Sequence, residues 1–281
     1  MALKKTWLVL AFLTAAGIAH AADTSQPLSL SDLPSVVQKT ITSHIGDGQL
    51  GDIDKTNEAG EIVFETSFTT KAGDERGFTV ADDGTLLSEE VSFAETPAAV
   101  QKAIQAEASG WELESIDKNL DDTEIYYDVE ATKDGREEKF TAAEDGDTLC
   151  EEVPLTNTPA AVQATIKAQV ADGDLVSIAE IFEPDGNSFD AEATAKNGSH
   201  KSFSVSAAGQ LLSEEVALEK VPPGARKTIE AKIGDGKVLR VDKSLVEKKG
   251  GVLPYEVQGR KDGKPFNFSV GPRGRFLGMD N

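Results

Sequence analysis

The chain has 281 residues, of which 39% are hydrophobic and 27% are charged, and its formal net charge is −21 at pH 7. This composition is typical of a globular protein and excludes a disordered or collagen-like chain, while the length allows more than one domain. The sequence holds one cysteine, Cys150, which excludes an intramolecular disulfide.

The first 21 residues have the pattern of a secretory signal peptide. Lys4 and Lys5 supply positive charge, Leu8 to Ala19 form an apolar run of 12 residues, and Ala19-His20-Ala21 fits the small-x-small cleavage pattern. A bilayer needs roughly 20 apolar residues, so this run is too short to span one, and no later stretch qualifies. We therefore expect a signal peptide at 1–21, a periplasmic or secreted protein, and no membrane anchor after cleavage.

A fourteen-residue segment recurs along the rest of the chain. Its copies are FTVADDGTLLSEEV (78–91), FTAAEDGDTLCEEV (140–153), FSVSAAGQLLSEEV (203–216) and FSVGPRGRFLGMDN (268–281). Self-similarity at a fixed period indicates a repeat architecture. It predicts four tandem repeats, residues 22–93, 94–155, 156–218 and 219–281, which we call copies 1 to 4.

Each copy begins with a proline followed by a helical pattern. In copy 1, Pro34 precedes apolar residues at Val37, Ile41 and Ile45, a spacing that keeps one stripe on one face of a helix. Proline is well suited to a helix start, and glycine to its end. The corresponding prolines are Pro97, Pro159 and Pro222, and the predicted terminating glycines are Gly46, Gly110, Gly173 and Gly234.

Four strand patterns follow each predicted helix. In copy 1 they are an irregular strand around Leu50 and Ile53, an alternating strand around 64–68, a strand from Phe78, and a last strand after the turn at Gly84. We therefore predict an α+β fold of four tandem repeats, each one helix followed by a four-stranded antiparallel meander sheet. A unit of this size is marginal alone, so we expect the copies to pack in pairs or in a row.

This plan resembles the PepSY-like repeat family, including its tandem, β-lactamase-inhibitor-like form. The resemblance rests on Leu33-Pro34 with Val37 and Ile41, on the Asp-Gly hairpins, and on the Gly-x-Leu of the last strand. It implies an envelope or secreted binding module, in some members an inhibitor of an enzyme, with no shared catalytic residues. Copy 4 departs from the pattern because it ends in Leu277-Gly278-Met279 where the other copies have an acidic pair.

Acidic side chains are predicted on the face of the strands opposite the helices. Because side chains alternate along a strand, they lie between inward apolar residues. We take them as a candidate partner-binding sheet face, with a solvated face that discourages edge-to-edge aggregation as the alternative. The candidate residues are Glu65, Glu90, Asp128, Glu152, Asp190 and Glu215.

The sequence predicts no catalytic, cofactor or metal residues. His44 and His200 lie at non-equivalent positions of different copies, and no zinc-ligand spacing or nucleophile motif is present. Asp117, Asn119 and Asp121 have EF-hand-like spacing, but Asp122 stands where that loop requires glycine. Weak binding of divalent cations by the acidic surface stays open.

Charge is distributed unequally among the copies. Copies 1 to 3 carry 14, 18 and 9 acidic residues against 4, 5 and 3 basic ones, whereas copy 4 carries 8 acidic and 14 basic residues. Such asymmetry bears on partners and association. We predict a noncatalytic binding module of the cell envelope that binds an envelope protein, in the manner of an inhibitor or regulator; no nucleic acid partner is expected. The alternative is a cation-responsive structural protein with salt-sensitive self-association.

Overall fold

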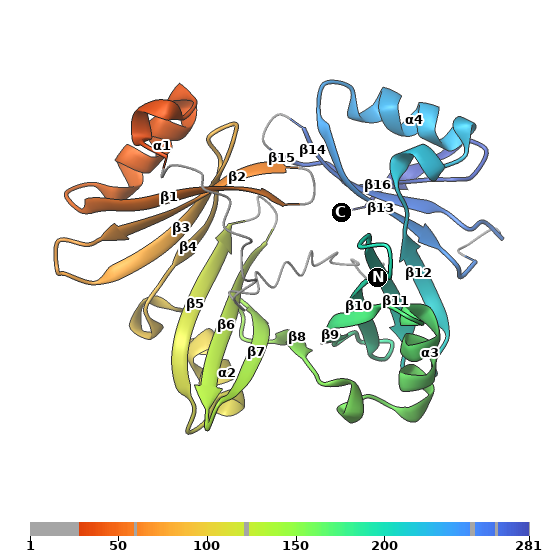
Figure 1. Ribbon diagram of the computed structural model, residues 1–281, viewed down its shortest axis with the longest axis horizontal. Helices are drawn as coiled ribbons and strands as arrows, with labels where there is room; N and C mark the ends of the chain where they lie inside the picture. The colour runs from red at the N-terminus through yellow and green to blue at the C-terminus, as the bar shows by residue number, and fades with distance from the viewer. Residues whose placement is uncertain (1–27, 59–60, 121–123, 248–250, 262–263, 281) are drawn as a thin grey trace. The chain divides into compact units, whose positions relative to one another are not determined.

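The computed structural model describes residues 28–58, 61–120, 124–247, 251–261 and 264–280, and the predicted signal peptide lies outside them (Figure 1). The described residues divide into two compact units, 28–147 and 148–280. The four predicted repeat boundaries stay a prediction. Within the described ranges, no helix is long and apolar enough to cross a membrane.

Unit 28–147 contains two α-helices and seven strands that pair antiparallel in chain order. Its elements are η1 (Leu30–Asp32), α1 (Ser35–Ile45), β1 (Gln49–Glu58), β2 (Glu61–Thr69), β3 (Glu75–Ala81), β4 (Leu86–Glu90), η2 (Phe93–Glu95), α2 (Ala98–Glu107), β5 (Glu112–Leu120), β6 (Ile125–Lys133) and β7 (Arg136–Ala143).

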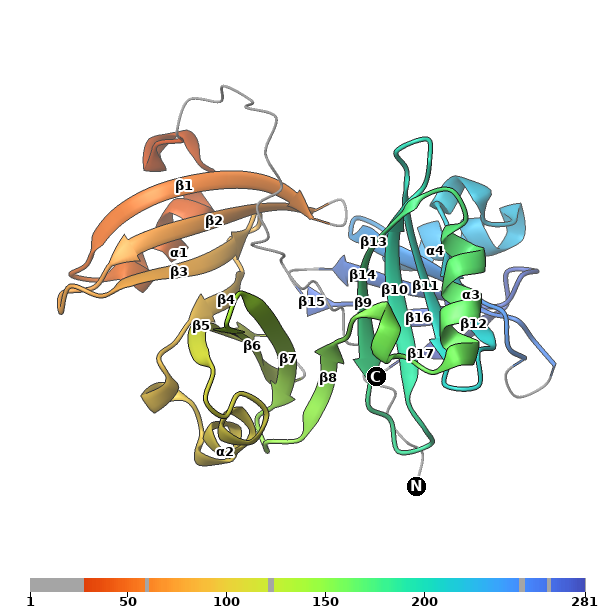
Figure 2. The same cartoon turned by 60° about the horizontal axis from the view of Figure 1, so that its bottom comes forward.

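Unit 148–280 has the same alternation of helix and antiparallel strands, and α3 lies over β10 and β11 (Figure 2). Its elements are β8 (Thr148–Glu152), η3 (Leu155–Asn157), α3 (Ala160–Val170), β9 (Asp174–Ile181), β10 (Ser188–Thr194), β11 (His200–Ser206), β12 (Leu211–Glu215), η4 (Leu218–Lys220), α4 (Pro223–Ile233), β13 (Lys237–Ser244), β14 (Tyr255–Lys261), β15 (Lys264–Pro265), β16 (Phe268–Val270) and β17 (Phe276–Met279).

The helices begin where the prolines predict. Pro34, Pro97, Pro159 and Pro222 are the N-cap residues of α1 to α4. The predicted ends are confirmed for α1 and α4, whose C-caps are Gly46 and Gly234. They are wrong for the other two helices, because the C-cap of α2 is Ala108 and that of α3 is Ala171, a non-glycine residue with a positive φ of 52°.

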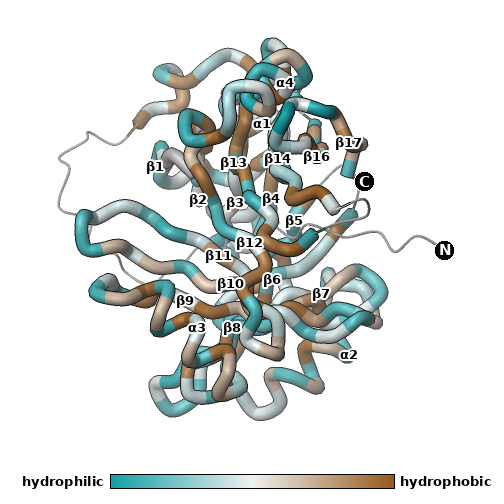
Figure 3. Tube along the Cα trace, turned by 90° about the vertical axis from the view of Figure 1, so that its right-hand side faces the viewer, coloured by the Kyte–Doolittle hydropathy of each residue, from teal (hydrophilic) through white to brown (hydrophobic). Residues whose placement is uncertain are grey.

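Each helix packs on one face of the strands that follow it and forms a separate core there. The phenylalanine that opens each fourteen-residue segment is buried in one of these cores: Phe78, Phe140, Phe203 and Phe268. Along the strands in Figure 3, hydrophobic residues are interspersed with hydrophilic ones, as expected when one face is covered and the other is not.

The recurring glycine of the segment forms a turn that touches a helix. At Gly209, with φ of +82°, an added Cβ would lie 2.8 Å from backbone atoms of Ala161 in α3. The Thr165 hydroxyl donates a hydrogen bond of 2.6 Å to the Gly209 carbonyl. Thr40 and Thr228 make the same bond to Gly84 and Gly274. The glycine therefore recurs because it lets the hairpin turn approach the helix.

The predicted fold class is wrong. The described residues form four α-helices and 17 antiparallel strands, and strands of neighbouring copies share one sheet within each unit, so the fold is mostly β and not four separate helix-plus-meander domains. One reason is that β4 pairs with β5, and β12 with β13, so strands of neighbouring copies are hydrogen-bonded directly. Another is the interruption between β15 and β16, where the Asn267 side chain, instead of a backbone carbonyl, accepts a hydrogen bond of 3.3 Å from the Gly259 N–H.

The irregularity predicted for the first strand of each copy is confirmed. Register shifts fall between Leu50 and Ile53 in β1, between Leu113 and Ser115 in β5, and between Val238 and Arg240 in β13. Ser115 and Arg240 are thus the first paired residues after the shift in their strands. This makes them structurally equivalent positions of the two units.

Candidate functional site

The six predicted face residues lie on strands, between side chains that point into the cores, and therefore on the face away from the helices. Several already have partners within the protein. Glu65 accepts a hydrogen bond of 3.0 Å from the Thr56 hydroxyl, and Glu90 accepts one of 2.9 Å from the Gly77 N–H. Glu152 is half-buried and stands opposite Ala179.

Unit 28–147 brings two of the predicted residues together with a third carboxylate. Glu90 on β4 stands opposite Asp117 on β5, which stands opposite Asp128 on β6. We call these three residues the carboxylate row. Asp128 accepts hydrogen bonds from the Thr141 hydroxyl and, at 2.8 Å, from the Asn119 amide. Like charges directly opposite one another on a sheet are destabilising.

The pKa values of two members of the row lie above their ordinary value. The pKa of Asp117 is raised to about 6, chiefly by burial and also by the neighbouring charges of Glu90 and Glu130, against the lowering effect of a hydrogen bond with Ser115. The pKa of Asp128 is likewise raised to about 6, chiefly by burial and also by the charges of Asp117 and Glu130, against the lowering effect of its hydrogen bonds from Thr141 and Asn119. The carboxylate row therefore ionises at a cost, because it is partly removed from water and its members repel one another.

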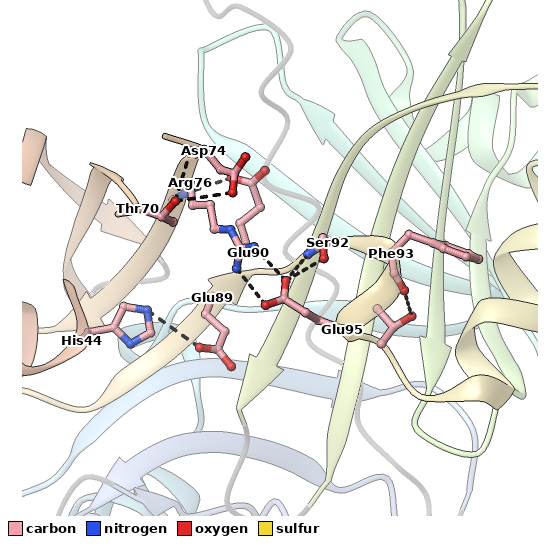
Figure 4. Close-up of polar contacts among 11 residues, drawn as sticks. His44, Thr70, Asp74, Arg76, Glu89, Glu90, Ser92, Phe93 and Glu95 are labelled. Atoms are coloured by element: carbon pink, nitrogen blue, oxygen red, sulfur yellow. Dashed lines mark hydrogen bonds and ion pairs between the residues drawn. The ribbon is translucent and has the colours of Figure 1, made fainter. Parts of the chain in front are cut away.

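Three basic side chains of this unit, Arg76, Lys118 and Lys139, form ion pairs with other acids. Arg76 pairs with Glu95 at 2.9 Å, and Lys118 pairs with Glu89 at 2.9 Å. Lys139 pairs with Glu130 at 3.0 Å across β6 and β7. Hydrogen bonds from Ser92 and the contact with Arg76 lower the pKa of Glu95 to about 2. Figure 4 shows Glu95 between Arg76 and Ser92.

A pocket of about 440 Å³ lies in unit 28–147 where strands of copies 1 and 2 meet. Its lining includes His44, Phe68, Glu89, Lys118 and Tyr127. The His44 ring packs 4.4 Å from that of Phe78 and points to Glu89, at 3.8 Å (Figure 4). Because Glu89 is shared between His44 and Lys118, its charge is balanced within the protein.

Unit 148–280 has the equivalent row, with a cation seated on it. Glu215 on β12 stands opposite Asp242 on β13, which stands opposite Glu256 on β14. The Arg240 guanidinium donates two hydrogen bonds to the Asp242 carboxylate, at 2.7 and 2.9 Å, and lies 3.9 Å from Glu215. A two-pronged pair of this kind is among the strongest charge-assisted contacts in proteins.

Asp190, another predicted face residue, lies near the same guanidinium. Burial raises the pKa of Asp190, while a hydrogen bond from Ser204 and the charge of Arg240 oppose that rise. Burial alone would lower the pKa of Arg240, but its bonds to Asp242 outweigh this and raise it. The second unit therefore holds its buried acids around one internal arginine.

Two residues of these sites were not predicted from the sequence: Asp117 of the carboxylate row and Arg240, the cation of unit 148–280. In the sequence, Asp117 stands out only for its EF-hand-like spacing, and Arg240 is one of the 14 basic residues of copy 4. A signal was available, because Arg240 and Asp242 are two residues apart and so share a strand face. Among the described residues, no group of three or more His, Cys, Asp and Glu is arranged to hold a metal ion.

No protein-family model and no curated protein matches the sequence. Similar solved structures include a BLIP-like protein from Bacteroides fragilis, with 20% identity and a TM-score of 0.32 over 42% of this chain and 84% of that chain. A DUF2874 family protein from Bacteroides uniformis has 16% identity and a TM-score of 0.32 over 41% and 86%. A protein from Bacteroides eggerthii, described as periplasmic, has 18% identity and a TM-score of 0.34 over 42% and 87%.

All three TM-scores are below 0.5, and the identities are 20% or less. The name PepSY-like is not confirmed, since no family model matches. The export signal, which lies outside the described residues, stays a sequence prediction.

Proposed function

We propose that the protein is a noncatalytic binding module of the cell envelope, and that the sheet face of unit 28–147 docks a basic region of an envelope protein. The observation that carries this proposal is the carboxylate row. Three acids stand side by side on neighbouring strands, and the charged groups that act on Asp117 and Asp128 are themselves acidic. A docked cation would offset the repulsion between these carboxylates. That attraction, which the free protein lacks, would make the free energy of association more favourable.

Capture of envelope proteins by the mature chain tests this proposal. The variant Glu90→Lys reverses a half-buried charge of the row, and Glu107→Lys makes the same change at an exposed position on α2, on the other side of the strands. We expect Glu90→Lys to weaken capture of the partner at least tenfold and Glu107→Lys to leave it unchanged. Equal capture by both variants would contradict docking on this face.

The deeply buried acids are poor choices for that experiment. Asp128 and Asp190 accept hydrogen bonds from Thr141 and Ser204, so a lysine at either position would disturb the strands themselves. Glu90 is bound only through the Gly77 N–H among the hydrogen bonds described, and its reversal is better tolerated. Inhibition of an enzyme is a finer form of the same proposal, and a captured enzyme assayed with and without the chain decides it.

A second candidate function is salt-sensitive self-association. It is favoured by the basic residues of copy 4, of which Lys227, Arg273 and Arg275 are exposed, set against the acidic copies 1 and 2. Attraction between exposed charges is screened over about 10 Å at 0.1 M salt. Light scattering should then show dimers or larger species at low ionic strength that dissociate on adding salt; a monomer at every salt concentration contradicts this candidate.

A further inference from the structure

The two units contain one polar seam each, built in the same register. In unit 28–147, Ser88, Glu89 and Glu90 of β4 stand opposite Asn119, Lys118 and Asp117 of β5. In unit 148–280, Ser213, Glu214 and Glu215 of β12 stand opposite Ser244, Lys243 and Asp242 of β13. The flanking ion pairs also agree, because Lys118 lies 2.9 Å from Glu89 and Lys243 lies 2.8 Å from Glu214.

The seams differ where the guanidinium sits. Arg240 follows the register shift in β13, and Ser115 follows the matching shift in β5. Beside the guanidinium, Ser202 accepts a hydrogen bond of 2.8 Å from Arg240, whereas the first unit has Gly77 at that position. An added Cβ on Gly77 would meet nothing closer than 3.8 Å. The first seam therefore keeps the acids but has small residues where the second places a cation and its partner.

The acids of the first seam are accessible. Glu90, Asp117, Ser115 and Gly77 are all partly exposed, so a group from outside the protein reaches them without unfolding a strand. Lys139 does not take the place of Arg240, because it is buried on β7 and pairs with Glu130, which stands on β6 between Lys139 and Ser115. The second seam shows which group fits: a planar guanidinium that binds an aspartate with two hydrogen bonds and approaches a glutamate on the next strand.

We propose that Glu90 and Asp117, with Asp128 behind them, receive the guanidinium of an arginine side chain from a protein partner, in the place that Arg240 takes in the other unit. This inference rests on the proposed function, and it identifies the partner side chain that binds the carboxylate row, which we call the anchor. The guest arginine donates two hydrogen bonds to the Asp117 carboxylate and lies near Glu90. Ser115 and Gly77 leave room for its side chain to enter from the open face.

The test is an NMR titration of the mature chain with N-acetyl-arginine amide, followed at the backbone amides of Gly77, Glu90 and Asp117. Ser115→Arg supplies the guanidinium from within the chain and should abolish the response, with binding at least tenfold weaker. Ser177→Arg is the matched control. It makes the same change at the equivalent position of β9, where Ala179 replaces the aspartate of the row.

We expect the arginine probe to shift these amides in the wild type and in Ser177→Arg, and the neutral analogue N-acetyl-citrulline amide to leave them in place. Amide shifts spread over the acidic surface, and reduced equally by Ser115→Arg and Ser177→Arg, would overturn the proposal. They would show that the probe binds only by nonspecific charge attraction. Should Ser115→Arg unfold, Asp117→Asn replaces it, since it removes the two-pronged acceptor while keeping the shape; a retained response in that variant overturns the proposal.

The two experiments distinguish failure of the arginine anchor from failure of the proposed docking surface. If Glu90→Lys weakens partner capture but Ser115→Arg does not, the face docks its partner without a guanidinium and the anchor is wrong. If the probe binds at Asp117 but partner capture is insensitive to every change on the face, the anchor stands and the proposed docking surface is wrong.

Discussion

Replacing Asp117 by asparagine should stabilise unit 28–147 at neutral pH and not at acidic pH. The folded-state pKa of Asp117 is about 6 against an ordinary value of 3.8. Because the folded pKa is raised, the folded state binds the proton more tightly, and stability is lost as pH rises from the unfolded value through the folded one. The difference corresponds to at most about 3 kcal/mol, and partial exposure lowers the expected gain in Asp117→Asn to about 1–3 kcal/mol at pH 7.5.

Urea unfolding followed by tryptophan fluorescence measures this gain. Trp111 is the one tryptophan outside the predicted signal peptide, and it packs against the core that α2 forms with β5 to β7. At pH 3.5 the variant and the wild type should unfold at nearly the same urea concentration, because Asp117 is then protonated. Asp145→Asn, in an exposed turn, is the control and should change little. A stability difference of equal size at both pH values would refute the electrostatic reasoning.

Two further changes test the internal packing of unit 148–280. Arg240→Met should lower the free energy of unfolding by about 3–5 kcal/mol, because Asp242 is 2% exposed and loses its cation. The control Arg226→Met, on the surface of α4, should lower it by less than about 1 kcal/mol in the same thermal melts. Equal losses would contradict an internal role for Arg240. Gly209→Ala should cost more than Gly198→Ala, by about 1–3 kcal/mol in urea unfolding. Both glycines have φ near +80°, but only at Gly209 would the Cβ meet a helix backbone, so equal costs would mean that backbone strain alone decides.

The helices and cores were predictable because their signals are local. A proline followed by apolar residues at helical spacing places Val37 and Ile41 on one face, and both are fully buried. The phenylalanines at 78, 140, 203 and 268 are buried for the equally local reason that strand side chains alternate. Nothing beyond the neighbouring residues was needed for either prediction.

The pairing of β4 with β5 was not predictable in the same way. The strands are separated by η2 and α2, and no periodicity reports which edge a strand finds after such a connection. The fold class was wrong for this reason. The carboxylate row was missed for it as well, because Asp117 and Glu90 meet only through that pairing.

The backbone hydrogen bonds between β4 and β5 also decide how the chain responds to cleavage. A protease that cuts the segment between Glu90 and Ala98 would break the covalent link between copies 1 and 2, yet the two pieces would remain held edge to edge with Lys118 still bound to Glu89. Fragments produced separately should therefore recognise each other and reassemble by complementation. A single copy isolated on its own would instead expose its last strand to any other chain with an open edge.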